Sequence, residues 1–295
     1  MKSTLQLSPV IAGCMKWGQW GVKFSTAQYL QLIEECLVAG ITTFDHADIY
    51  GDYTVEEEFG NALKQKSSLR QQLQIITKCG IRRFTPNRPE HTINSYDTSK
   101  EHIIQSAEKS LSNFHTDYLD ALLIHRPDAL MQPDEIAEAF TQLKQQGKVL
   151  HFGVSNFTPS QLQMVNSRFP VEFNQIEISV LCLDPFHNGQ LDQCLELNIT
   201  PMAWSPMGGG KLMENLEEEQ NIRILAVSQY LSKKYDATID QVLLAFLTTH
   251  PAGIIPVMGT TKIERLISAY DAGKLKLKRE EWYMLWRASK GHEVP

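Results

Sequence analysis

Short apolar, β-prone runs alternate with helical patterns along the whole chain, and this alternation restricts the possible folds more than any other feature. Parallel strands need a crossover connection between them, and a helix usually supplies it. We expect strands at residues 10–15, 41–44, 73–77, 118–124, 150–154, 173–176, 199–204 and 254–257. Eight such units in 295 residues predict a (β/α)₈ barrel that forms a single domain over residues 1–295.

Capping residues and turn glycines delimit the helices between these strands. Ser25 and Gln28 form a predicted capping box, and Gly40 ends the same helix. Pro159 stands at the first position of another helix, where its missing N–H costs nothing. The other helices are expected at residues 55–66, 99–113, 133–146, 187–197, 219–235 and 239–249, with a final one after Lys262.

A doubly wound parallel sheet is the alternative architecture. Such a sheet typically has fewer strands and carries a GxGxxG turn directly after its first strand. Gly13 and Gly18 follow the first expected strand but do not form this turn. No linker rich in proline or serine divides the chain, so the barrel is the better interpretation.

Four polar residues stand at or just after three successive strand ends. They are Asp45, Tyr50, Lys78 and His125. Because the carboxyl ends of all barrel strands meet on one face, we expect these four side chains to cluster there. Each residue alone has a more ordinary explanation, such as a surface lysine or a structural histidine, so the joint placement carries the prediction.

The stretch from Thr42 to Gly51 allows three interpretations. It could be a strand end followed by ordinary loop residues. It could be a metal site made of Asp45, His46 and Asp48, although neighbouring residues on a strand point to opposite faces and would not converge. It could also be an acid–base set in which Tyr50 donates a proton, and this needs a nearby cation to lower the pKa of the tyrosine.

Lys78 can supply that cation, and the four residues together fit one task. Tyr50 can give a proton to an oxygen that gains negative charge, while Lys78 favours the tyrosinate. Asp45 can keep the lysine charged and oriented. His125 can donate a hydrogen bond to the same substrate oxygen.

These motifs resemble those of the aldo-keto reductase family from end to end of the chain. Residues 44–51 (FDHADIYG), 77–80 (TKCG) and 123–127 (LIHRP) are similar to the family's Asp/Tyr, lysine and histidine motifs. The resemblance implies a catalytic tetrad of Asp45, Tyr50, Lys78 and His125, with Tyr50 as the general acid and no metal. The run His-Arg-Pro-Asp at 125–128 looks most like a bacterial oxidoreductase subgroup.

The same resemblance implies NADPH as the cofactor. Ser155, Asn156 and Gln175 would hold the nicotinamide amide, and Trp204 would stack on the nicotinamide ring. Backbone N–H groups along Ser205, Pro206, Met207 and Gly208 would surround the pyrophosphate. The 2′-phosphate would lie at a helix start formed by Gly259, Thr260, Lys262 and Arg265.

Composition argues against two classes of partner, nucleic acids and membranes, and the resemblance implies a small carbonyl substrate. The net charge of −6 argues against a nucleic-acid surface, and no run is long and apolar enough to span a membrane. The five scattered cysteines fit reduced thiols and a cytoplasmic location.

We therefore expect an NADPH-dependent reductase of aldehydes or ketones. The alternative is a non-catalytic, cofactor-sensing or regulatory module on the same fold. The sequence does not indicate the oligomeric state. Substrate choice is expected to depend on Trp17, Trp20, the loops 80–98 and 181–188, and the tail with Trp282 and Trp286.

Overall fold

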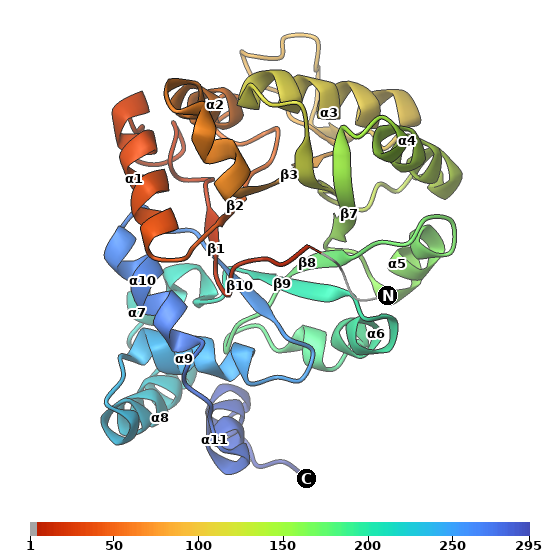
Figure 1. Cartoon of the computed structure of the whole chain (residues 1–295). Helices are drawn as coiled ribbons and strands as arrows, with labels where there is room; N and C mark the ends of the chain where they lie inside the picture. The colour runs from red at the N-terminus through yellow and green to blue at the C-terminus, as the bar shows by residue number, and fades with distance from the viewer. Residues whose placement is uncertain (1–4) are drawn as a thin grey trace.

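A computed structural model describes residues 5–295 of the chain and shows a closed barrel of parallel strands. The strands follow one another around the barrel in the order β1-β10-β9-β8-β7-β6-β3-β2, so β1 closes the ring against β10 (Figure 1). The strands are β1 (Ile11–Gly13), β2 (Thr43–Asp45), β3 (Gln74–Cys79), β6 (Leu119–Ile124), β7 (Val149–Ser155), β8 (Phe173–Glu177), β9 (Thr200–Trp204) and β10 (Ile255–Met258). This arrangement confirms the predicted (β/α)₈ barrel.

Helices surround the strands and cover their outer faces (Figure 1). The predicted capping box at Ser25 and Gln28 is present, and Thr158 and Thr238 begin two more helices in the same way. The helices of the ring are α1 (Thr26–Val38), α2 (Val55–Gln65), α3 (Lys100–Phe114), α4 (Pro133–Gln145), α5 (Pro159–Asn166), α6 (Gln190–Leu197), α8 (Glu219–Tyr235), α9 (Ile239–Thr248) and α10 (Ile263–Ala272).

Strand alternation divides the apolar side chains into two layers. One layer fills the barrel, with Ile76, Leu123, Phe173 and Met202 among its members. The other lies between the strands and the helices, where Phe44 of β2 packs against Phe59 and other aromatic rings. Residues two positions apart on a strand share a face. The last inward-facing residue of each strand therefore lies at the carboxyl end of the barrel.

Three features were not expected from the sequence. The long loop after β3 contains a two-stranded hairpin, β4 (Ile81–Arg82) with β5 (Ser95–Tyr96). A short helix, α7 (Lys211–Glu214), follows β9. The C-terminal segment forms α11 (Arg279–Lys290), which lies against α8 at the outside of the barrel (Figure 1).

The aromatic side chains proposed to select the substrate divide into two groups. Trp17 is fully buried and packs in the outer core against Phe44. Trp282 stacks on Phe246 of α9, with ring centroids 4.6 Å apart, and on Trp286. Trp20 alone among the four tryptophans contacts Tyr50, with ring centroids 6.2 Å apart.

Within residues 5–295, every helix is too short or too polar to cross a membrane.

Candidate active site

Five of the predicted site residues share one position in the barrel pattern. Each of the five lies two residues beyond a member of the inner apolar layer, so it faces the barrel interior at the carboxyl end. Ile76 precedes Lys78 on β3, Leu123 precedes His125, Phe173 precedes Gln175, Met202 precedes Trp204, and Val257 precedes Gly259. The strand period therefore brings together residues that lie on, or directly after, five different strands and far apart in the sequence.

Lys78 forms the centre of the site and is completely buried. Its ammonium group donates to both carboxylate oxygens of Asp45 at 2.7 and 2.8 Å, and to the backbone carbonyl of His46 at 2.7 Å. It also lies 3.2 Å from the Tyr50 hydroxyl. A buried ammonium keeps its charge only when such partners replace water. Burial alone would lower the pKa of Lys78, but Asp45 and Tyr50 outweigh this effect and raise it.

Asp45 is shared between two donors. Besides Lys78, the side-chain amide of Gln175 donates to its Oδ1 at 2.8 Å. Gln175 was predicted only as a contact of the nicotinamide amide, and the link to Asp45 joins β8 to β2 across the barrel. The carbonyl oxygen of the Gln175 side chain is then free to accept from another group.

Tyr50 and His125 stand beside each other above the ion pair. Their ring centroids are 6.0 Å apart with an interplanar angle of 81°. Burial raises the pKa of the Tyr50 hydroxyl, and the charge of Lys78 offsets part of this increase. The predicted effect of Lys78, which lowers the pKa of Tyr50, is present. Burial has the larger effect, so the net shift of this pKa is upward. Tyr50 therefore stays protonated at neutral pH, as a proton donor must.

His125 is neutral in this environment. Burial lowers its pKa well below the usual value, and the positive charges of Lys78 and Arg126 lower it further. A neutral imidazole carries one N–H, so His125 can donate a hydrogen bond without adding charge. All four residues of the predicted tetrad thus lie together at the carboxyl end of the barrel.

The metal interpretation of residues 45–48 is not supported. The His46 ring lies against Phe59 and Phe114, away from Asp45, and neither of its nitrogens has a hydrogen-bond partner. Asp48 lines a separate pocket. In residues 5–295 no three His, Cys, Asp or Glu side chains are placed to hold one ion.

Hydrogen bonds connect the residues proposed for the nicotinamide amide. The Ser155 hydroxyl donates to the backbone carbonyl of Gln175 at 2.8 Å, and the Asn156 side chain donates to the Ser155 hydroxyl at 2.8 Å. The indole N–H of Trp204 donates to the Asn156 side-chain oxygen at 2.9 Å. Asn156 has a φ of 62°, which turns its side chain back over the strand ends. The ring of Trp204 is therefore held at a fixed angle over the site.

The loops after β9 and β10 were predicted to bind the phosphates of the cofactor. Gly208, Gly209 and Gly210 have φ values of 65°, 66° and 95°, which glycine adopts without strain, and the N–H groups of Gly208 and Gly210 donate to the backbone carbonyls of Ser205 and Met207 within the same turn. Helix α10 begins after Lys262, whose side chain does not cap the first N–H groups. Lys262 and Arg265 are exposed and pair with no acidic group within residues 5–295. The uncapped helix start and the two unpaired cations fit a dinucleotide that carries a 2′-phosphate.

Two arginines flank the catalytic residues and were not predicted as part of the site. Arg126 lies over the ring of Trp204, with its guanidinium carbon 5.8 Å from the ring centroid. Arg83 lies over Trp20 at 5.0 Å. The sequence signal was their position, one directly after His125 and one in the long loop after β3.

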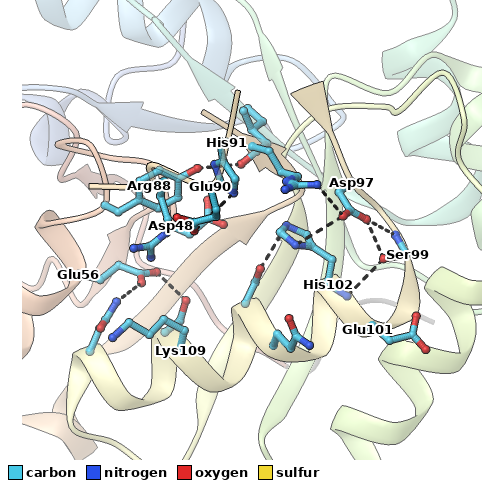
Figure 2. Close-up of a pocket in the computed structure, with 17 residues that line it drawn as sticks. Asp48, Glu56, Arg88, Glu90, His91, Asp97, Ser99, Glu101, His102 and Lys109 are labelled. Atoms are coloured by element: carbon cyan, nitrogen blue, oxygen red, sulfur yellow. Dashed lines mark hydrogen bonds and ion pairs between the residues drawn. The ribbon is translucent and has the colours of Figure 1, made fainter. Parts of the chain in front are cut away.

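A separate polar pocket of about 420 Å³ lies behind this loop, between the hairpin and α3. Figure 2 shows Asp48 and Glu56 on one side of it, and Asp97, Ser99 and His102 on the other. Glu56 is saturated by hydrogen bonds from Thr77, Ser110 and Asn113. None of the four clustered residues Asp45, Tyr50, Lys78 and His125 lines this pocket, so it is separate from their cluster.

Comparisons with known proteins agree with this geometry. The model of the Aldo/keto reductase family matches residues 9–289. An uncharacterized oxidoreductase, YcsN of Bacillus subtilis, is 47% identical over 99% of this chain and 97% of its own. A 6-dehydroglucose reductase of Agrobacterium fabrum is 39% identical over 100% of this chain and 98% of its own.

A solved structure gives the same result for the fold. The thermostable aldo-keto reductase Tm1743, in complex with the inhibitor epalrestat, superposes with a TM-score of 0.80 and 25% identity, covering 97% of each chain. With a family model that spans nearly the whole sequence and a barrel that places the four motif residues together, the chain belongs to the aldo/keto reductase family.

Proposed function

We propose that this protein is an NADPH-dependent reductase of aldehydes and ketones, with Tyr50 as the general acid. The observation that carries the proposal is the Lys78 ammonium group, bonded on one side to Asp45 and on the other to the Tyr50 hydroxyl, beside a neutral His125. The relatives with oxidoreductase names support turnover of a carbonyl compound. The intact tetrad likewise favours an enzyme over a non-catalytic, cofactor-sensing module.

The roles of the side chains follow from their contacts. NADPH, when bound by these residues, would supply the hydride for the carbonyl carbon. Tyr50 gives its proton to the carbonyl oxygen as negative charge develops there, and the ammonium of Lys78 stabilises the tyrosinate left behind. His125 donates a hydrogen bond to the same oxygen and positions the substrate. Asp45, held by Gln175, keeps Lys78 oriented.

The residues proposed for the cofactor divide into two sets. Asn156, Gln175 and Trp204 would hold the nicotinamide against the tetrad, in the hydrogen-bonded arrangement described above. Lys262 and Arg265 would bind the 2′-phosphate at the start of α10, which favours NADPH over NADH. The fit rests on the uncapped helix start and on the absence of acidic partners for these two cations within residues 5–295.

The direct test measures NADPH oxidation by the purified protein with a panel of small aldehydes and ketones. Tyr50→Phe should lower kcat by at least about 10²-fold, because the variant loses only the proton donor. Its affinity for NADPH, measured by fluorescence titration, should stay close to that of the wild type. A wild type with no turnover would favour the regulatory module, and a Tyr50→Phe variant with normal kcat would refute the role of Tyr50.

A further inference from the structure

The turn that follows Tyr50 has an unusual backbone. Gly51, Asp52 and Tyr53 have φ values of 57°, 53° and 73°, so three successive residues occupy the left-handed region. Glycine adopts this conformation freely, whereas it is unfavourable for the side-chain-bearing Asp52 and Tyr53. Such a conformation persists only when surrounding contacts hold it, and strained residues of this kind cluster at functional sites.

Asp52 supplies those contacts by joining three loops. Its Oδ1 accepts from Nε of Arg83 at 2.8 Å, in the loop after β3. Its Oδ2 accepts from the Gln19 side chain at 3.0 Å, in the loop after β1. Its backbone carbonyl accepts from the Asn87 side chain at 2.9 Å. The Tyr53 hydroxyl accepts from the backbone N–H of Arg83 at 2.8 Å, so both strained residues fix the same arginine.

These contacts place the Arg83 guanidinium close to the catalytic residues. It lies over the face of Trp20 at 5.0 Å, and Trp20 in turn contacts Tyr50. The guanidinium is therefore about one aromatic ring away from the proton donor. Only its Nε is used by Asp52, and its two terminal nitrogens make no hydrogen bond within residues 5–295. The side chain is 42% exposed, so this free edge can receive a ligand from solvent.

We propose that Arg83 is a specificity residue, which binds a carboxylate on the substrate about one aromatic ring away from the carbonyl group. The proposal rests on the carbonyl reductase function proposed above and adds a class of substrate to it. A guanidinium edge with two parallel N–H donors matches a carboxylate in geometry and charge. Arg126 adds a positive charge over the ring of Trp204, whereas Asp52 offsets part of the charge of Arg83. The terminal N–H donors of Arg83 therefore carry the attraction for a carboxylate.

Two aldehydes that differ only at the far end of a benzene ring test the proposal. These are 4-carboxybenzaldehyde and its methyl ester, methyl 4-formylbenzoate. Arg83→Gln should lower kcat/KM for the acid about tenfold, as expected for one partly exposed charged hydrogen bond. The loss should be in KM, because the contact exists before and during the reaction. The ester should change less than about twofold.

Neighbouring residues provide matched controls. Arg82 precedes Arg83 on the hairpin but faces the polar pocket, where it pairs with Asp97 at 3.7 Å. Arg82→Gln should therefore leave the ratio of kcat/KM for the two aldehydes unchanged. Raising the salt concentration should reduce the preference in the wild type but not in Arg83→Gln.

A binding measurement tests the contact without turnover. The alcohol 4-(hydroxymethyl)benzoate, titrated against tryptophan fluorescence, should bind about tenfold more weakly to Arg83→Gln than to the wild type. Equal losses for acid and ester, an effect of Arg82→Gln as large as that of Arg83→Gln, or a preference lost only in Arg126→Gln would each overturn the proposal. Absence of turnover with both aldehydes would count against the reductase function, while the titration would still decide the role of Arg83.

Discussion

Replacing Lys78 by methionine separates the structural role of the ion pair from its chemical role. The methylene chain of methionine can follow the path of the lysine stem, but the variant has no ammonium group. Asp45, which is 2% exposed, would keep the Gln175 amide as its remaining side-chain donor. Removing one partner of a buried pair costs about 3–5 kcal/mol, because the other charge stays buried without compensation. We expect a loss of that size in the free energy of unfolding.

A double variant provides the control for this reasoning. In Asp45→Asn/Lys78→Met neither charge remains, and the asparagine oxygen can still accept from Gln175. Neutral replacement of a whole buried pair is often tolerated. We therefore expect the double variant to recover most of the stability lost in Lys78→Met. Both variants should lose turnover by at least about 10²-fold, since neither can stabilise the tyrosinate of Tyr50.

Urea unfolding of the three proteins, followed by tryptophan fluorescence and circular dichroism, measures these differences. The slope of the unfolding free energy against urea should be the same in all three, so the midpoints report stability directly. A Lys78→Met protein as stable as the wild type would show that Asp45 is not left as a buried, unpaired charge. If the double variant is no more stable than Lys78→Met, the loss of stability comes from packing and not from electrostatics.

Two further predictions concern cofactor choice and pH. Arg265→Ala should weaken NADPH binding by about tenfold and leave NADH binding nearly unchanged, as measured by fluorescence titration at fixed ionic strength; equal losses would mean that Arg265 only supports the loop. His46 is buried without hydrogen-bond partners, and burial, followed by the charge of Lys78, lowers its pKa well below the usual value. Unfolding lets it bind a proton below about pH 6.5, so the histidine makes the protein less stable as the pH falls through that value. His46→Leu should reduce this slope by about 1.4 kcal/mol per pH unit, and an unchanged slope between pH 6.5 and 5 would contradict the assignment.

Much of the fold and the tetrad could be predicted from the sequence because both depend on short-range periodicity. Strand alternation decides which residues face the barrel interior, and the turn residues after each strand decide where the chain leaves it. Asp45, Lys78 and His125 follow that rule. Predicting that these three side chains meet therefore required only the correct number of strands. The assignments of Lys262 and Arg265 to the 2′-phosphate, and the His-Arg-Pro-Asp subgroup, stay predictions.

Other properties depend on contacts between segments that have no fixed spacing in the sequence. The bond from Gln175 to Asp45 crosses the barrel, and the pairing of Arg83 with Asp52 joins the loop after β2 to the loop that contains the β4–β5 hairpin. Helix α11 places Trp282 and Trp286 on the outer face of the barrel because their rings stack on Phe246 and one another.

The direction of the pKa shift of Tyr50 is the clearest case in which tertiary structure decided the outcome. The sequence by itself established that a lysine would stand beside the tyrosine and favour its ionised form. The enclosure of the hydroxyl by the surrounding loops withdraws it from water, and this desolvation outweighs the charge of Lys78. Residue types and spacing therefore determined which groups meet at the end of the barrel. Only the packing around them decided how deeply they are buried, and so in which direction the pKa of each group shifts.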